Sequence, residues 1–275
     1  MDKQPILAFV LLIGVILALA FPGFYGHHSS NVTATPIDTS IPTIYPTPVS
    51  SPTPTPIPVV KTLEWSGYSW IVDDYRGGVF TTNNVWVDSE GRLHMKLIYK
   101  DGKWNEFNVI LKDPIGYGTY SWTVDTDLED IQDVQDGGNP NFIFSGFSYD
   151  DSLPDYNYGE IDIEHCKWGN PDLDSNTDWT IHPANHLVQY KHITGANNTD
   201  TIEWMPDHIK FSVQGPSQPY MEYVFNDHSQ IPPASGYMQW LFYVGEVKSH
   251  PPPNNIGYYE AEVVIRNFKI VPYTA

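Results

Sequence analysis

Between about Val60 and Ala275, the chain consists of many short segments with β-strand character, separated by turn residues. Apolar residues alternate with polar ones or form short apolar runs. Asp88–Gly91 and Lys100–Gly102 have the composition of hairpin turns. No stretch shows convincing helical periodicity. The predicted strands are Asn84–Asp88, Leu93–Tyr99, Phe107–Leu111, Tyr117–Thr126, Asn141–Tyr149, Gly159–His165, His186–Lys191, Thr201–Met205, Ile209–Val213, Met221–Phe225, Gln239–Val247 and Tyr258–Val271. We therefore predict an all-β domain over residues 60–275, built as one large β-sandwich or barrel.

The first 28 residues have a different character. A short polar start with Lys3 precedes an apolar run over Ile6–Phe21, which is typical of an export element. Ala18-Leu19-Ala20 offers a cleavage site, while the apolar run also approaches the roughly 20 residues that span a bilayer. A cleaved signal peptide and an uncleaved membrane anchor both remain open. Either one predicts a protein that is extracellular or held at the cell surface.

Residues 29–59 are rich in Thr, Pro and Ser and contain no Lys or Arg. Closely spaced prolines prevent helices and sheets and favour extended polyproline II. We therefore predict a disordered, semi-rigid stalk of the type that carries O-linked sugars. Asn31 and Asn197 each begin an N-glycosylation sequon.

Charge and cysteine content exclude several classes of partner. The formal net charge of -19 argues against nucleic acid and against an anionic membrane surface. Membrane contact is predicted only through residues 1–28. Cys166 is the single cysteine, so no intrachain disulfide forms, and no Cys/His cluster has zinc-ligand spacing. We expect a monomer that requires no cofactor and no metal.

The segment Gly159–His165 carries the strongest functional signal. Three carboxylates, Glu160, Asp162 and Glu164, alternate there with two isoleucines. Side chains of a β-strand point alternately to opposite faces, so the three acids share one face and the isoleucines the other. Crowded acids leave one carboxylate ionised and another protonated, and cleavage of a glycosidic bond needs such a pair. The alternative is an ordinary solvated edge strand.

Three features favour the functional interpretation. Like charges at every second position lie about 6.6 Å apart at Cα and repel each other. The motif contains no Lys or Arg to neutralise them. If the pleat continues, Cys166 and Trp168 share the face of the acids, where the Trp168 indole can stack on a sugar ring. The alternative for Trp168 is a plug at the end of the strand.

The spacing also constrains the shape of the sheet. Positions i and i+4 on a flat strand lie about 13 Å apart, whereas retaining glycosidases need carboxyl groups about 5–5.5 Å apart. Glu160 and Glu164 must therefore lean together, which predicts a curved sheet with the acids on its concave side.

Gly159–Glu164 resembles the Glu-x-Asp-x-Glu signature of glycoside hydrolase family 16, which comprises laminarinases, lichenases and xyloglucan transglycosylases. The run Glu164–Gly169 is similar to a bacterial and archaeal branch whose motif reads Glu-Ile-Asp-Ile-Glu-Phe-x-Arg-Trp-Gly. The resemblance covers nearly all of residues 60–275. Further segments that look like the family's, in its order, are Gly78–Asp88, Gly91–Leu97, Gly116–Trp122, Asn141–Phe147 and Thr201–Val213.

The chain departs from the family in two other segments. Asn198 and Asp200 stand near the usual His-x-Tyr. The tryptophan usual in the cleft strand is absent, and Phe142, Phe144, Phe147 and Tyr149 occur there instead.

The resemblance implies a concanavalin A-like jelly-roll β-sandwich, with substrate bound in a curved, concave catalytic sheet and hydrolysed with retention of configuration. Matched position by position, Glu160 is the nucleophile and Glu164 the general acid/base, while Asp162 orients or tunes them. The aromatic residues expected to bind substrate are Phe147, Tyr149, Trp168 and Trp240. Trp240 stands on an apolar strand, where a core position is the default and a cleft position the alternative.

Two further groups of residues remain open. Some family members carry a structural ion, and the acids between positions 125 and 139 offer a calcium site, although a solvated loop is the alternative and EF-hand spacing is absent. His182, His186 and His192 follow the acidic strand, and loop or core positions are the default for them. The acids between positions 125 and 139, which offer the calcium site, are Asp125, Asp127, Glu129, Asp130, Asp133 and Asp136.

These observations predict an exported, retaining glycoside hydrolase that acts on β-linked polysaccharide, with β-1,3 or β-1,3-1,4 glucan as the expected substrate. One alternative is a non-catalytic carbohydrate-binding lectin or adhesin displayed on the stalk. The other is a transglycosylase on the same fold.

Overall fold

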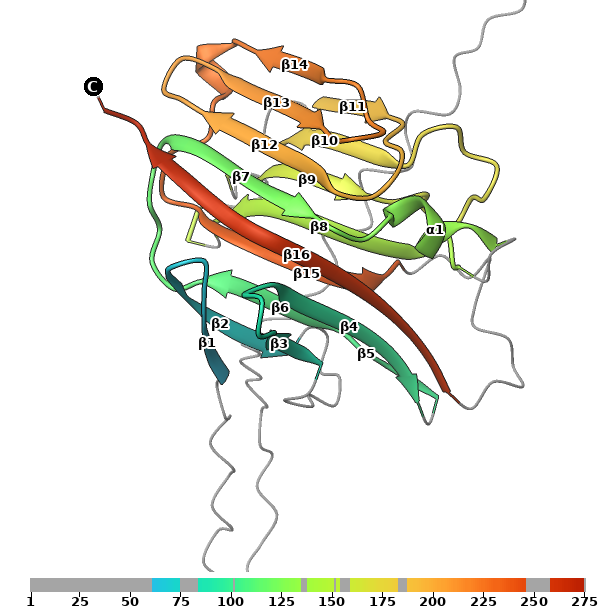
Figure 1. The fold of residues 1–275 in the computed structure, drawn as a ribbon. Helices are drawn as coiled ribbons and strands as arrows, with labels where there is room; N and C mark the ends of the chain where they lie inside the picture. Colours follow the sequence, from blue (N-terminus) through green and yellow to red (C-terminus); the bar gives the residue numbers. More distant parts are fainter. Residues whose placement is uncertain are drawn as a thin grey trace, which may run out of the picture. The chain divides into compact units, whose positions relative to one another are not determined.

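The alternating segments fold into two antiparallel β-sheets that pack face to face (Figure 1). The computed structural model describes residues 61–74, 84–100, 102–134, 138–150, 152–153, 159–182, 187–245 and 258–274. The predicted export element, the stalk, the Asn31 sequon, the start of the Gly78–Asp88 motif, Asp136 and His186 lie outside these residues. Within them, no helix is both long and apolar enough to cross a bilayer.

Sheet A has the strand order β1-β2-β6-β15-β8-β9-β10-β11. Sheet B has the order β14-β13-β12-β7-β16-β4-β3, with β5 paired to β4. The elements are β1 (Lys61–Trp65), β2 (Tyr68–Asp74), β3 (Val85–Val87), β4 (Leu93–Lys100), β5 (Lys103–Asn105), β6 (Phe107–Leu111), β7 (Gly118–Val124), α1 (Leu128–Gln132), β8 (Phe142–Tyr149), β9 (Ile161–His165), β10 (Thr177–Ile181), β11 (Leu187–Lys191), β12 (Asn198–Trp204), β13 (Ile209–Gln214), β14 (Met221–Phe225), the 3-10 turn His228–Gln230, β15 (Tyr237–Val244) and β16 (Tyr258–Pro272).

The prediction of an all-β sandwich is confirmed, and every predicted strand is present with its ends shifted by a few residues at most. The two predicted hairpins join β3 to β4 and β4 to β5. Four strands were not predicted: β1, β2, β5 and β10. The expectation of no helix was wrong for five residues, because α1 forms where the side chain of Asp127 accepts the backbone N–H of Glu129 and caps the first turn.

The core lies between the sheets and is unusually aromatic. Trp65, Trp70, Trp122 and Trp240 are buried, and the ring centroids of Trp70 and Trp240 lie 4.6 Å apart. Most tryptophans are therefore core residues rather than sugar platforms. Of the two positions expected for Trp240, the core is confirmed and the substrate-binding position was wrong, because β15 directs its indole inward and leaves it 0% exposed.

A glycine in β8 permits this packing. A Cβ atom added to Gly146 would lie 2.6 Å from the indole of Trp122, closer than side chains approach in proteins. Gly146 pairs with Ile163 of β9 and with Trp240 of β15, so its position lies at the centre of sheet A. The missing side chain lets the two sheets approach each other where the acidic strand lies.

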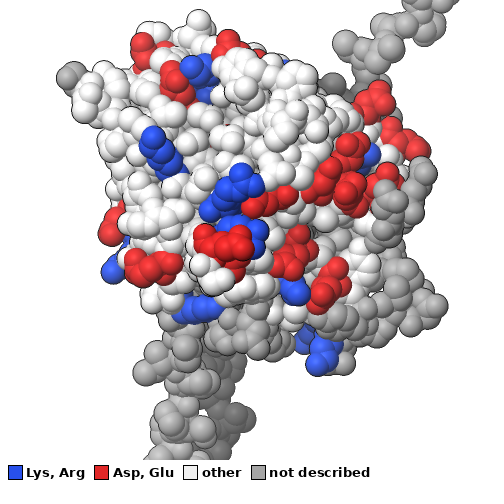
Figure 2. All heavy atoms as spheres, viewed as in Figure 1, with Lys and Arg blue, Asp and Glu red and all other residues white. Residues whose placement is uncertain are grey.

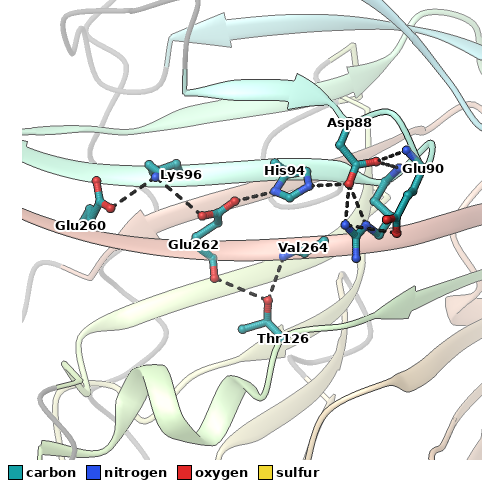
Figure 3. Close-up of polar contacts among 9 residues, drawn as sticks. Asp88, Glu90, His94, Lys96, Thr126, Glu260, Glu262 and Val264 are labelled. Atoms are coloured by element: carbon teal, nitrogen blue, oxygen red, sulfur yellow. Dashed lines mark hydrogen bonds and ion pairs between the residues drawn. The ribbon is translucent and has the colours of Figure 1, made fainter.

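The outer face of sheet B carries paired charges (Figures 2 and 3). The carboxylate of Asp88 accepts the backbone N–H of Arg92 at 2.8 Å and pairs with its guanidinium at 2.7 Å. His94 contacts Asp88 at 3.1 Å through Nε2 and Glu262 of β16 through Nδ1. The Arg92 N–H, ahead of the other contacts, holds the pKa of Asp88 well below its usual range. The network joins the β3–β4 turn to β16.

Candidate active site

The three acids of the β9 motif lie on the outer face of sheet A, as the alternation predicts. Ile161 and Ile163 are fully buried in the core. Asp162 is buried on the opposite face, and Glu160 and Glu164 are half-buried. Glu160 precedes β9, but its carbonyl still accepts the backbone N–H of His182, which continues the pairing between β9 and β10. We call this surface, around Glu160, Asp162 and Glu164, the acidic face.

Two hydroxyl groups from neighbouring strands donate hydrogen bonds to the acids. Ser145 of β8 donates through Oγ to Asp162 Oδ1 at 2.6 Å. Tyr243 of β15 donates through its hydroxyl to Glu164 Oε1 at 3.4 Å. Both bonds favour the ionised form of the acceptor. Neither donor was predicted from the sequence.

A fourth carboxylate, Asp178, belongs to the acidic face. The register of β9 and β10 places it directly opposite Glu164, and it is 3% exposed. Its Oδ2 accepts the indole N–H of Trp168 at 2.7 Å and lies 3.6 Å from Cys166 Sγ. Asp178 links the end of the acidic strand to its neighbour.

Trp168 lies beside the acids, but the reason predicted for it was wrong. The pleat does not continue that far, since β9 ends at His165 and Trp168 has a left-handed φ of 50°. A turn directs its indole back to Asp178 instead. Trp168 packs on a small apolar cluster that includes Phe147 and Cys166.

Burial raises the pKa of every carboxyl group on the acidic face, and repulsion between carboxylates adds to the rise for Glu160, Asp162 and Glu164. For Glu160, burial and then the charge of Glu164 raise the pKa to about 8. The pKa of Glu164 lies well above its usual range, through burial first and then the charges of Asp162 and Asp178. Burial, followed by Glu160, raises the pKa of Asp162 in the same way. For Asp178, burial raises the pKa to about 6, and the Trp168 hydrogen bond opposes that rise.

Repulsion between Glu160 and Glu164 is informative because flat-strand geometry separates their Cα atoms by about 13 Å. Glu164 is the second-largest cause of the raised pKa of Glu160, so the two side chains influence each other across Asp162. Four crowded carboxyl groups titrate as a set and retain at least one proton near neutral pH. The set can therefore supply both a carboxylate and a carboxylic acid.

Two predicted aromatic residues also lie on the outer face of sheet A. Phe147 and Tyr149 of β8 pack with Leu241 and Tyr243 of β15, in the same cluster as Trp168. Phe147 is directly opposite Asp162 in the register. An exposed tyrosine that was not predicted, Tyr190 of β11, pairs with Asp178.

The core face of β9 holds a polar link between the sheets. His165 is buried, and its Nε2 lies 3.0 Å from Oδ2 of Asp200 on β12. Its Nδ1 lies 3.0 Å from the hydroxyl of Thr177. Asp200, noted as a departure from the family pattern, is thus a buried partner of the residue that follows Glu164.

The acids proposed for calcium are used structurally where they are described. Asp125 pairs with Arg266 at 2.8 Å, and Asp127 caps α1. Glu129 lies 3.6 Å from His192, which fits the loop position expected for that histidine. Among the described residues, no three of these acids come together as a metal site.

Comparison with solved structures shows which proteins share this fold. A glycoside hydrolase family 16 endo-glucanase from Bacteroides ovatus matches with a TM-score of 0.55 and 15% identity, over 74% of this chain and 94% of that one. A laminarinase from a Flavobacterium species matches with a TM-score of 0.56 and 15% identity, over 73% of this chain and 92% of the laminarinase. An immunostimulatory antigen and pseudo β-1,3-glucanase of Mycobacterium tuberculosis matches with a TM-score of 0.54 and 16% identity, over 74% and 91%.

No protein-family profile and no curated protein sequence matches the chain. The fold is therefore the jelly-roll β-sandwich of glycoside hydrolase family 16, as the motif predicted. The same sandwich occurs in proteins described as glucanases and in one described as a pseudo-glucanase, so the fold alone does not establish an activity.

Proposed function

We propose that the chain is a retaining glycoside hydrolase of family 16 that cleaves β-linked polysaccharide, with β-1,3 or β-1,3-1,4 glucan as substrate. The observation that carries the proposal is the acidic face itself. It combines the alternating acids of β9 with raised pKa values, on a fold shared with β-glucanases. A strand retained only for solubility would leave its acids exposed and unshifted.

In this proposal Glu160 is the nucleophile and attacks the anomeric carbon as a carboxylate. Because burial and the charge of Glu164 raise the pKa of Glu160 to about 8, Glu160 must lose its proton before the attack, while the coupled set keeps a proton on Glu164. Glu164 protonates the leaving oxygen, then removes a proton from the water that releases the covalent intermediate. The raised pKa of Glu164 suits the acid step, because the group keeps its proton near neutral pH. Asp162 lies between them, and its carboxyl group accepts the hydroxyl of Ser145.

Aromatic side chains flank the acids on both sides. Phe147 and Tyr149 lie on β8, Trp168 lies beyond β9, and Tyr190 is exposed on β11. Their ring faces suit the apolar faces of sugar rings. The apolar run Ile6–Phe21 and the stalk that follows support export and display of this domain.

The test is hydrolysis of laminarin, lichenan and related β-glycans by wild type and by Glu160→Gln. We expect cleavage by wild type, with the first product in the β configuration by NMR, and a loss of at least about 10³-fold in the variant. Asp207→Asn removes an exposed acid outside the acidic face and should retain activity. Glycan binding without hydrolysis by wild type and variant alike would favour the lectin alternative instead.

A further inference from the structure

Three side chains with metal-binding atoms meet at the end of the acidic strand. They are Glu164 of β9, Cys166 just beyond it, and Asp178 of β10, and their ligand atoms all lie within 4.8 Å of one another. Within the described part of the chain, this is the one such group of three. Tetrahedral zinc with oxygen and sulfur ligands places its ligand atoms roughly 3.3–3.8 Å apart. Cys166 Sγ and Asp178 Oδ2 are already 3.6 Å apart.

In the described part of the chain, the carboxyl groups at this point have no Lys or Arg partner, and the nearby His165, which lowers the pKa of Asp178, lies on the core face of β9. No Lys or Arg of the described residues forms an ion pair with Glu164 or Asp178. Asp178 is only 3% exposed, and among the described residues its Oδ1 atom has no hydrogen-bond partner. Burial and the nearby carboxylates raise the pKa of the Cys166 thiol. A dication would neutralise all three groups at once.

Both carboxylate ligands are oriented by a hydrogen bond from a further residue. The Trp168 indole N–H donates to Asp178 Oδ2 at 2.7 Å, and the Tyr243 hydroxyl donates to Glu164 Oε1 at 3.4 Å. Metal sites in proteins characteristically have such outer hydrogen bonds, which fix the direction of the ligand. Cys166 is held by its backbone N–H, which donates to Asn176 at 2.8 Å.

We propose that Glu164, Cys166 and Asp178 bind one thiophilic divalent cation, of the Zn²⁺ or Cd²⁺ class, with water in the fourth position. Binding forms one metal–sulfur bond and two metal–oxygen bonds, and it releases to solvent both the Cys166 thiol proton and the proton that Glu164 holds near neutral pH. A thiolate with two carboxylates selects these borderline and soft cations over Ca²⁺ and Mg²⁺, which prefer oxygen ligands alone.

The consequence for catalysis rests on the proposed function. A cation on Glu164 occupies the oxygen that must exchange a proton with the leaving group, so hydrolysis stops while the metal is bound. A chelator restores it. The site would thus act as an inhibitory metal site within the acidic face.

The binding test uses the full-length chain in detergent, titrated with Cd²⁺ and followed by the ultraviolet charge-transfer band of a Cd–thiolate bond. Cys166 is the single cysteine, so this band reports that residue alone. We expect one equivalent of Cd²⁺ per chain and competition by Zn²⁺ but not by Ca²⁺. Cys166→Ser should abolish the band, and Asp178→Asn should weaken binding at least tenfold.

Trp168→Phe tests the outer hydrogen bond and should weaken binding by about 10- to 100-fold while leaving the three ligands in place. Asp207→Asn is the matched control, because it removes an exposed carboxylate beside His208. Near-ultraviolet circular dichroism verifies that each variant is folded. A folded wild type without the band overturns the proposal, and so does a band whose affinity is unchanged in Asp178→Asn.

The inhibition test is separate from the binding test. If wild type hydrolyses a β-glycan, saturating Zn²⁺ should abolish hydrolysis and a chelator should restore it. Full activity at saturating Zn²⁺ overturns the inhibitory role. If the chain cleaves no glycan, the proposed function fails while the Cd²⁺ titration still decides whether the site binds metal.

Discussion

In the proposed mechanism, the chemistry of the acidic face depends most directly on Glu164. Its pKa is raised by burial and then by two carboxylates, Asp162 on its own strand and Asp178 on the neighbouring strand. The pKa of Asp178 is itself raised only to about 6, so Asp178 is ionised in the range where Glu164 must keep its proton. In the proposed mechanism Asp178 is therefore a positioning and tuning residue for Glu164, the acid.

Replacing Asp178 by Asn should move the basic limb of the pH–activity profile to lower pH. The substitution removes a negative charge beside Glu164, so the pKa of Glu164 falls and its proton is lost earlier as pH rises. We expect a shift of about one pH unit in kcat/KM against pH. Asn retains an oxygen that can accept the Trp168 indole N–H.

Asp207→Asn serves as the control for that profile, since Asp207 is exposed and pairs with His208 away from the acidic face. The Asp207→Asn variant should leave both the acidic and the basic limb of the pH–activity profile at their wild-type positions. A lower kcat in Asp178→Asn with an unmoved basic limb would show that Asp178 supports structure alone.

At this scale the sequence predicted the acids of β9 and missed their partners. Strict alternation of Ile and acid fixes the face of each side chain within one strand, and no knowledge of neighbours is needed. Asp178 meets Glu164 only through the register of β9 and β10, which depends on the course of residues 166–176. Tyr243 is 79 positions from Glu164 and reaches it through a third strand.

The elements of sheet A differ in how clearly their sequences define a face. β9 is amphipathic, so its orientation could be predicted. β15 reads Tyr237-Met-Gln-Trp-Leu-Phe-Tyr-Val244 and is apolar on both faces, so alternation alone could not separate Trp240 in the core from Tyr243 on the acidic face. β10 was missed because Asp178 and Thr180 interrupt its apolar pattern, although all five residues are buried.

The link between His165 and Asp200 should stabilise the sandwich by joining β9 to β12. Asp200→Ala leaves His165 Nε2 buried without its partner, so we expect the free energy of unfolding to fall by about 1–3 kcal/mol. Asp200→Asn keeps an oxygen acceptor and should cost less. Urea unfolding followed by near-ultraviolet circular dichroism measures both. Equal stability of the Ala and Asn variants would contradict a hydrogen-bonded role for this pair.

The outer faces of the two sheets differ in whether their acids are paired with basic side chains. The outer face of sheet B balances its acids with Lys, Arg and His (Figure 3). The acidic face of sheet A forms no ion pair with Lys or Arg among the described residues, and burial together with repulsion raises the pKa values of Glu160 and Glu164. Repulsion on the acidic face therefore destabilises the folded state, and burial of the large aromatic core between the sheets offsets this effect.

The stability of the whole domain should fall as pH rises from about 4.5 to 8, and Glu160→Gln should flatten that fall. The folded state raises the pKa of Glu160 from 4.5 to about 8, so within this window the folded chain holds a proton that the unfolded chain has lost. The stabilisation is complete below the unfolded pKa and is lost as pH rises through the folded pKa. Asp178 adds the same loss of stability as pH rises from 3.8 to about 6.

Thermal unfolding at a series of pH values from about 5 to 8.5 measures this linkage. Glu160→Gln removes one titrating group, so its melting temperature should decline less steeply than that of wild type and exceed it at the alkaline end. Glu90→Gln is the control, because Glu90 is exposed in the β3–β4 turn of the other sheet and its partner Arg92 stays charged throughout the window. Parallel curves for wild type and Glu160→Gln would mean that Glu160 titrates as an ordinary surface acid, and the acidic face would then lack the coupling that its chemistry requires.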